Sequence, residues 1–257
     1  MRANKYQDIV TIDDVVNELN DIIQECISNS DPRGYFAVLY KKVTVKVKEG
    51  IENNYFDDGA RMEKLDVIFA LRYIDAYNNA NKNLVVSRSW NESFSMAKKD
   101  EITVLQHILS GINAHINLDL GIAAYEVNKG VNIHELKNDF DRINQILSSM
   151  VHEVQYNLTT IWPPLKFLLQ KTGKIDDLLV DFSMKLARDG AWEFSVILAE
   201  NEETEIQNLI TERDKKVSSK IHLISPSGFT LKFIFSLISI FEKGSVADKI
   251  NLLKKEL

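Results

Sequence analysis

The sequence predicts an all-α fold, a single-domain bundle of several helices built around a buried central helix. The chain has 257 residues with only 10 Gly and 4 Pro, too few for an architecture rich in turns. Hydrophobic residues make up 45% of the chain and charged residues 26%, the composition of a globular protein with a substantial core. Apolar residues recur every three or four positions, the spacing of amphipathic helices. We therefore expect one helical domain over residues 1–257, in which residues 229–257 form a C-terminal helical cap.

Start and stop signals divide the chain into helices. Thr11 and Asp14 form a capping pair, and the turn sequence at 30–34 ends the first helix. Residues 43–48 alternate like a strand, but the helical pattern around them favours a helix over a two-stranded alternative. Further helices are expected to begin near Tyr35, after Asp58, after a capping box at 89–92, at Asp100, at Asn132 or Asn138, at Ile175, within the acidic run 200–205, and at 229 and 246.

Charge, cysteine content and hydropathy limit the classes of function. The net charge of −6 provides no basic field for phosphates, so we expect no nucleic-acid partner. Cys26 is the only cysteine and no apolar run follows Met1, so we expect a cytoplasmic protein without internal disulfides or a signal peptide. The most apolar segment, 229–241, is too short to span a membrane. It is expected to be a core helix or a partner-binding face, such as a homodimer interface.

The segment 106–121 places polar side chains on two sides of one apolar helix. At about 100° of rotation per residue, Asp119 lies one turn beyond His115 and about 40° from it, on an apolar face. Asn113 and Asn117 lie one turn apart on the opposite side. Since the rest of the segment is largely Ile, Leu, Ala and Gly, we expect this helix to be buried all round.

These four polar residues, if buried, need partners. A buried charge that loses its partner costs on the order of 3–5 kcal/mol, so they are expected to be paired, to bind a guest molecule, or both. One interpretation is a hydrogen-bonded core pair of His115 and Asp119, with Asn113 and Asn117 bridging to neighbouring helices. The other is a functional site in which the same four residues are the catalytic groups.

Two kinds of chemistry fit the functional interpretation. His115 would act as a general acid or base oriented by Asp119, which suits proton transfer on a small molecule. Alternatively, His115-x-x-x-Asp119 is a ligand pair for a divalent metal such as zinc, with His107 and His152 as further candidates. The sequence contains no E-x-x-H di-iron motif, Walker loop or G-x-S-x-G elbow.

A second polar stripe lies on the helix expected at 175–200. Arg188 and Trp192 are one turn apart and could clamp an anionic or planar ligand as substrate-binding residues. The alternative is an intrahelical ion pair next to an aromatic core residue. Asp57 and Arg72 belong to a third set, which helix caps and surface ion pairs would also explain.

Several of these segments together resemble a known family. The matching pieces are Phe56-Asp57-Asp58, Met62-Glu63, 65–70, Arg72-Tyr73, Trp90, 111–120 and 188–192. With its N-A-H-I-N-x-D-L motif, the chain resembles an uncharacterised, mostly bacterial helical family known as domain of unknown function 5995. The resemblance covers roughly residues 35–198. It implies that these polar residues, with Arg72, Trp90 and Asp57 as substrate-binding candidates, form a shared centre, and it implies no particular reaction.

The leading prediction is an enzyme that performs acid–base chemistry on a small organic molecule in a pocket inside the bundle. A metal-dependent hydrolase using the His115-x-x-x-Asp119 pair is the alternative among enzymes. A non-catalytic ligand-binding or protein-interaction module, acting through 229–241, is the alternative from another class.

Overall fold

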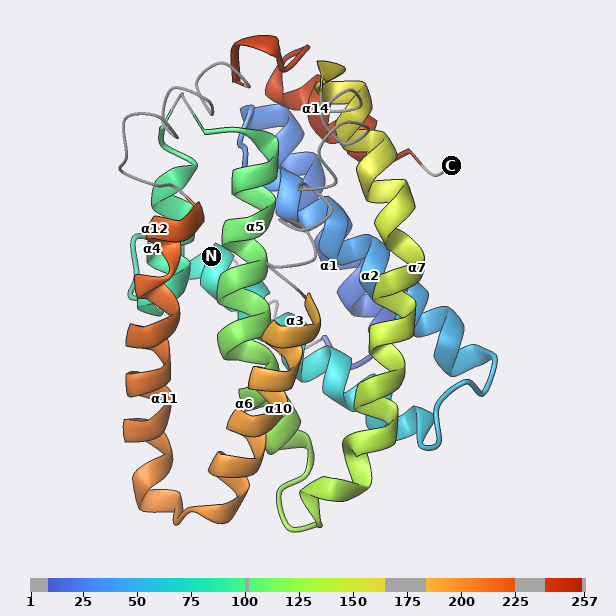
Figure 1. Ribbon diagram of the computed structural model, residues 1–257, viewed down its shortest axis with the longest axis vertical. Coiled ribbons are helices and arrows are strands. Elements are labelled where there is room, and N and C mark those ends of the chain that lie inside the picture. The colour runs from blue at the N-terminus through green and yellow to red at the C-terminus, as the bar shows by residue number, and fades with distance from the viewer. Residues whose placement is uncertain (1–8, 100–101, 165–183, 225–238, 256–257) are drawn as a thin grey trace.

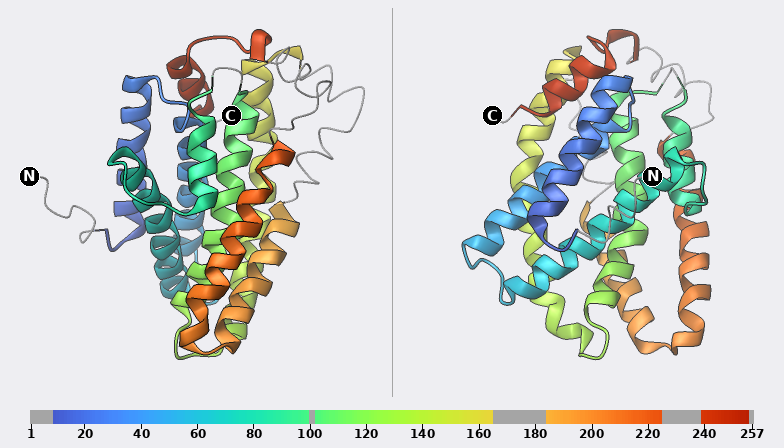
Figure 2. Two further views of the ribbon diagram at one scale, coloured as in Figure 1. Left: turned by 90° about the vertical axis from the view of Figure 1, so that its left-hand side faces the viewer. Right: turned by 180° about the vertical axis from the view of Figure 1, so that it is seen from behind.

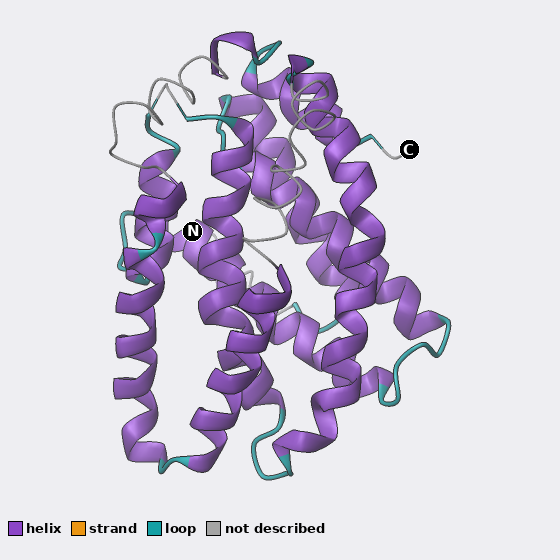
Figure 3. Cartoon of the chain, viewed as in Figure 1, coloured by secondary structure: helices purple, strands orange, loops and turns teal. Residues whose placement is uncertain are grey.

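A computed structural model describes residues 9–99, 102–164, 184–224 and 239–255. Within these ranges every regular element is a helix and no strand is present (Figure 3). The protein is thus an all-α bundle, as predicted. The helices, labelled in Figure 1, are α1 (Ile12–Asn29), α2 (Gly34–Glu52), α3 (Gly59–Asn81), α4 (Arg88–Met96), α5 (Val104–Ala114), the π-helical turn η2 (His115–Asp119), α6 (Leu120–Val127), the 3₁₀ turn η3 (Ile133–Leu136), α7 (Lys137–Ile161), α10 (Met184–Glu200), α11 (Glu203–Ser219), α12 (Ile221–Ile224) and α14 (Val246–Leu253).

The central helix is the continuous run of α5, η2 and α6. It begins after Thr103 and not at Asp100 as expected, because a capping box forms in which the side chains of Thr103 and Gln106 bond each other's backbone. Nearly every residue of the run is buried, because helices pack on it from several sides. α2 and α3 contact it on one side and α10 and α11 on the other, as the left-hand view of Figure 2 shows. The prediction of a buried central helix is confirmed.

Two glycines of the central helix allow its neighbours to approach closely. A Cβ on Gly111 would overlap the ring of Phe36 in α2. A Cβ on Gly121 would lie 2.8 Å from the carbonyl oxygen of Ala191 in α10. The absence of side chains at these positions therefore lets α2 and α10 pack directly against opposite sides of the same helix.

Capping and turn residues in the sequence predict most helix ends correctly. The capping pair of Thr11 and Asp14 begins α1, and Asp58 caps α3. Residues 43–48 are helical within α2, so the strand alternative is wrong. Asn132 caps η3, which leads directly into α7, and α7 ends at Ile161 before the Trp-Pro-Pro sequence.

The expected capping box at 89–92 is wrong. Ser87 is the N-cap of α4, and its hydroxyl accepts a hydrogen bond from the backbone N–H of Trp90. Ser89 lies in the first helical turn, where its backbone N–H and hydroxyl both donate to Asp214 of α11. A carboxylate from a distant helix thus caps α4 together with Ser87, a contribution that a local pattern does not contain.

Parts of the C-terminal half lie outside the described residues. The expected helix start at Ile175 belongs to these parts, as does most of the segment 229–241, so the proposed homodimer face stays a prediction. α14 packs against α1, α2 and α7. No helix among the described residues is both long and apolar enough to cross a membrane.

Candidate functional site

The central helix changes its winding at the motif itself. His115–Asp119 forms a π-helical turn, in which the backbone N–H of Leu120 bonds the carbonyl of His115. Arg213 of α11 supports the turn, since its Nε donates to the carbonyl of Asn117 at 2.8 Å and its Nη2 to that of Gly190 at 3.0 Å. Single π-helical turns inside α-helices are rare and occur frequently at functional sites.

Asp119 is a buried carboxylate bound by three neighbours. Its Oδ1 accepts from Arg72 Nε at 2.9 Å, and its Oδ2 accepts from Trp90 Nε1 at 2.8 Å and pairs with His115 Nδ1 at 3.2 Å. Burial raises the pKa of Asp119, but the Arg72 charge and the hydrogen bonds of His115 and Trp90 outweigh it and hold the pKa below its ordinary value. The carboxylate is therefore ionised at neutral pH.

His115 is held neutral inside a group of aromatic rings. Phe69 stacks on it with ring centroids 3.6 Å apart, and Tyr40 meets it edge-on at 4.4 Å. Burial lowers the pKa of His115 below its ordinary value, against the opposing effect of Asp119. Since the ionised Asp119 can only accept, the imidazole proton lies on Nδ1 and the lone pair on Nε2. Nε2 is buried and has no hydrogen-bond partner among the described residues.

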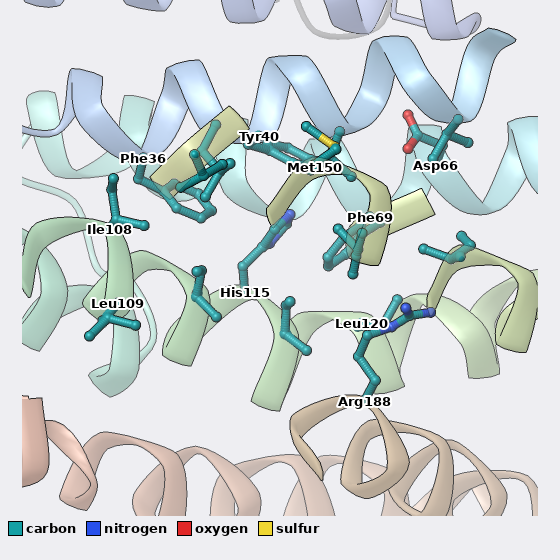
Figure 4. Close-up of a pocket in the computed structure, with 18 of the residues that line it drawn as sticks. Phe36, Tyr40, Asp66, Phe69, Ile108, Leu109, His115, Leu120, Met150 and Arg188 are labelled. Atoms are coloured by element: carbon teal, nitrogen blue, oxygen red, sulfur yellow. The ribbon is translucent and has the colours of Figure 1, made fainter. Parts of the chain in front are cut away.

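The His115 ring lines a largely apolar cavity of about 140 Å³ (Figure 4). The cavity is lined by residues of the central helix from Leu105 to Leu120, and by α2, α3, α7 and Arg188 of α10. At a rise of 1.5 Å per residue, these lining positions extend over about 22 Å of the helix. Four lining side chains carry strongly polar groups, and they are Tyr40, Asp66, His115 and Arg188.

Tyr40 and Asp66 bring two more polar groups without partners to this cavity. The Tyr40 hydroxyl interacts with the Thr44 hydroxyl, but neither it nor Asp66 Oδ2 makes a hydrogen bond of normal geometry with a described residue. Burial, helped by the nearby charge of Glu63, raises the pKa of Asp66 to about 8, so this carboxyl is protonated at neutral pH. Burial likewise raises the pKa of Tyr40 well above its ordinary value. Both groups are therefore neutral and able to donate a hydrogen bond.

The other predicted catalytic residues lie elsewhere on the central helix. Asn113 Nδ2 donates to the carbonyl of Val217 in α11 at 3.0 Å, and Asn117 Nδ2 donates to Asn113 Oδ1 at 3.1 Å. Neither asparagine lines the cavity. The structure thus brings His115 and Asp119 together with Arg72 and Trp90. The two asparagines instead link α5 and η2 to α11.

The remaining substrate-binding candidates are separated from one another. Arg188 lines the cavity, where it donates to Asn144 Oδ1 at 2.6 Å and to the carbonyl of Phe140 at 2.7 Å. Burial lowers its pKa to about 10. Trp192 packs against Phe140 outside the cavity lining. Asp57 is half-exposed and forms an ion pair with Arg142 at 2.6 Å.

Of the four metal candidates, only His115 and Asp119 meet in the described part of the chain. His107 lies beside Tyr35, and burial lowers its pKa to about 4. The side chain of His152 is outside what the structure describes. Among the described residues, no group of three or more His, Cys, Asp or Glu side chains is placed to hold a metal ion.

Sequence reasoning missed Tyr40, Asp66 and Phe69. The sequence contained a signal for two of them. Asp66 and Phe69 are three residues apart on the apolar stripe of α3, and a carboxylate on an apolar stripe indicates a buried polar group that needs a partner. Tyr40 carries no comparable signal, because a tyrosine at helical spacing is ordinary core material. Its proximity to His115 depends on how α2 packs against the central helix.

Fold and site together define an all-α protein whose central helix presents a carboxylate-anchored, neutral histidine to an apolar cavity. The chain belongs to the family of unknown function DUF5995, whose model matches residues 12–226. That range contains every residue of the site, and it confirms the resemblance seen in the sequence. Comparisons with curated proteins and with solved structures find no match.

Proposed function

We propose that the protein binds a small, largely apolar molecule in the cavity and that His115 performs acid–base chemistry on it. One observation supports this most directly. His115 lines an apolar cavity, and its Nε2 is buried and lacks a hydrogen-bond partner among the described residues, while its Nδ1 is bound to a carboxylate. Leaving a buried acceptor unsatisfied costs about 1–3 kcal/mol. A guest that hydrogen-bonds Nε2 would remove this cost.

The neighbours of His115 support the role of a base. Asp119 orients the imidazole and would stabilise the imidazolium that forms when Nε2 takes up a proton. Arg72 and Trp90 hold Asp119 in turn, so they are positioning residues and would not touch the guest. Since burial lowers the pKa of His115, the free base is the dominant form at neutral pH.

Indole and 1-methylindole test this site directly. Both are flat and apolar, but only indole carries an N–H that can donate to His115 Nε2. We expect indole to bind the native protein and to shift the Nε2 resonance of His115 in ¹⁵N NMR spectra. His115→Phe keeps a ring stacked on Phe69 and removes the acceptor, so indole affinity should fall about tenfold. Binding of 1-methylindole should change little.

His107→Phe is the matched control. His107 is also buried in the central helix, two turns before His115, but it does not line the cavity. This variant should bind both indoles like the native protein. If neither indole binds the native protein, the cavity is not a small-molecule site and the proposal fails. If His115→Phe and His115→Gln both unfold, His115 is a structural core residue, which also overturns the proposal.

A further inference from the structure

We propose that the cavity recognises a carbonyl compound, whose oxygen accepts hydrogen bonds from Tyr40 and Asp66 while His115 removes a proton from the neighbouring carbon. This inference rests on the proposed function and names its substrate class.

Four side chains line the cavity and carry a buried atom that makes no hydrogen bond of normal geometry among the described residues. Arg188 Nε is one of them, but its guanidinium is bonded to Asn144 and to the carbonyl of Phe140. The inference therefore follows from the other three atoms: His115 Nε2, the Tyr40 hydroxyl and Asp66 Oδ2. All three side chains are at most 5% exposed.

The three groups divide into one acceptor and two donors. His115 presents a lone pair, because its proton is fixed on Nδ1 by Asp119. Tyr40 presents a neutral hydroxyl, and Asp66 presents a protonated carboxyl because its pKa is about 8. A carboxylic acid kept neutral by an apolar site can donate a hydrogen bond to an oxyanion at neutral pH. The guest that satisfies all three must offer an acceptor and a removable proton.

A ketone or a similar carbonyl compound meets this requirement. His115 Nε2 takes a proton from the carbon next to the carbonyl, so that the C–H bond breaks and an N–H bond forms. The electron pair of the C–H bond becomes a C=C bond, and the carbonyl oxygen gains a negative charge that Tyr40 and Asp66 stabilise. The imidazolium, stabilised by Asp119, then returns the proton to the same carbon or to a conjugated one. Return of the proton to a conjugated carbon is an isomerisation. Hydrogen exchange results when the imidazolium first swaps its proton for one from water and then returns that proton to the same carbon.

The cavity also limits the size and polarity of the guest. Apart from its four strongly polar residues, the lining is almost entirely aliphatic and aromatic, as the side chains of Figure 4 illustrate. Its volume of about 140 Å³ is close to that of an engineered protein cavity, about 150 Å³, that binds benzene. A cyclic ketone or a short-chain ketone would therefore fit, whereas a sugar would leave its hydroxyl groups without partners.

The first experiment compares phenol with toluene. Phenol has the shape of toluene and an oxygen that resembles that of an enolate. We expect the native protein to bind phenol at least tenfold more tightly than toluene. Tyr40→Phe and Asp66→Leu, which remove one donor each, should reduce this preference without weakening the binding of toluene. Tyr73→Phe is the matched control, because the Tyr73 hydroxyl is also buried and unpartnered but Tyr73 does not line the cavity.

The second experiment measures proton transfer itself. Cyclohexanone in D₂O should exchange its hydrogens next to the carbonyl faster with the native protein than with His115→Gln, as followed by ¹H NMR. Tyr40→Phe should slow this exchange on the order of 100-fold, the effect of losing one donor to a developing oxyanion. Tyr73→Phe should leave the exchange rate unchanged.

The outcomes separate this inference from the proposed function. If toluene and the indoles bind but phenol is not preferred, the apolar site stands and carbonyl recognition is wrong. If phenol is preferred through Tyr40 and Asp66 but cyclohexanone does not exchange, the proton-transfer step is wrong. If neither indole binds the native protein, the proposed function itself fails.

Discussion

The two sides of the central helix carry similar polar residues, but these residues differ in whether the described part of the chain supplies their hydrogen-bond partners. On the side of α11, Asn117 donates to Asn113, which in turn donates to the carbonyl of Val217. On the side of α2 and α3, His115 Nε2 and Asp66 Oδ2 remain without partners among the described residues, beside a cavity. On the first side the polar groups complete a helix–helix contact, whereas the second side retains buried polar groups to which the described residues supply no partner.

The same contrast separates two buried carboxyl groups, Asp119 beside His115 and Asp66 in the lining of the cavity. Asp119 has three partners and is ionised, whereas Asp66 Oδ2 has no partner among the described residues and Asp66 is protonated at neutral pH. Neighbouring groups rather than residue type decide which carboxyl is an anion and which is a donor. His115 thus has a bound anion, Asp119, behind it, and a protonated carboxyl, Asp66, lines another wall of the cavity that His115 lines.

Removal of the Asp119 carboxylate is expected to have the largest effect on stability. Asp119→Ala removes the closest buried acceptor of Arg72. It also leaves His115 Nδ1 and Trp90 Nε1 without any acceptor that the structure shows. Losing one member of a buried charged network costs about 3–5 kcal/mol. Urea unfolding followed by circular dichroism would measure this loss. A loss below about 1 kcal/mol would show that these three donors find other acceptors.

Asp66 is expected to make stability depend on pH in a characteristic direction. Its pKa rises from 3.8 to about 8 on folding, so the folded state binds more protons between these values and stability falls as the pH rises. Asp66→Asn removes this dependence. The free energy of unfolding of the variant, relative to the native protein, should therefore increase by on the order of 3 kcal/mol from pH 5 to pH 8. Parallel curves for the two proteins across this range would mean that Asp66 is ionised in the fold.

Close packing on the cavity side predicts a penalty at Gly111. Gly111→Ala would push its Cβ into the ring of Phe36, and such overpacking costs about 1–3 kcal/mol. Gly190→Ala in α10 is the control, because its Cβ would meet only Arg213 Nη2 at 3.4 Å. Helix propensity should make the control neutral or up to about 1 kcal/mol more stable. Thermal unfolding of both variants measures the difference, and an equal penalty in the two would contradict the predicted overlap.

The smallest effect is expected on the side of α11. Asn117→Ala removes one hydrogen bond to Asn113, which contributes about 1 kcal/mol to stability. Because Asn117 does not line the cavity, indole affinity should stay unchanged in a calorimetric titration. A loss of indole binding in this variant would return Asn117 to the functional site and would remove the contrast between the two sides.

Local patterns were sufficient for the helices and for one pair in the site. Thr11 and Asp58 begin α1 and α3 where the sequence indicated, because capping depends on residues within one turn. His115 and Asp119 lie one turn apart on one helix, so their contact is local as well. The N-cap of α4 was misplaced because Asp214, from a helix more than 100 residues away in the chain, contributes to that helix end.

The sequence by itself determined that the protein is helical, that the segment 106–121 is buried, and that His115 faces Asp119. These properties follow from the periodicity of residues close together in the chain. Only the tertiary structure decided which polar groups find partners, because Arg72, Trp90 and Val217 come from other helices. The packing of α2 and α3 likewise placed Tyr40 and Asp66 in the lining of the same cavity as His115, and burial there set their protonation. Partner choice and desolvation depend on contacts between distant segments, which no local spacing encodes.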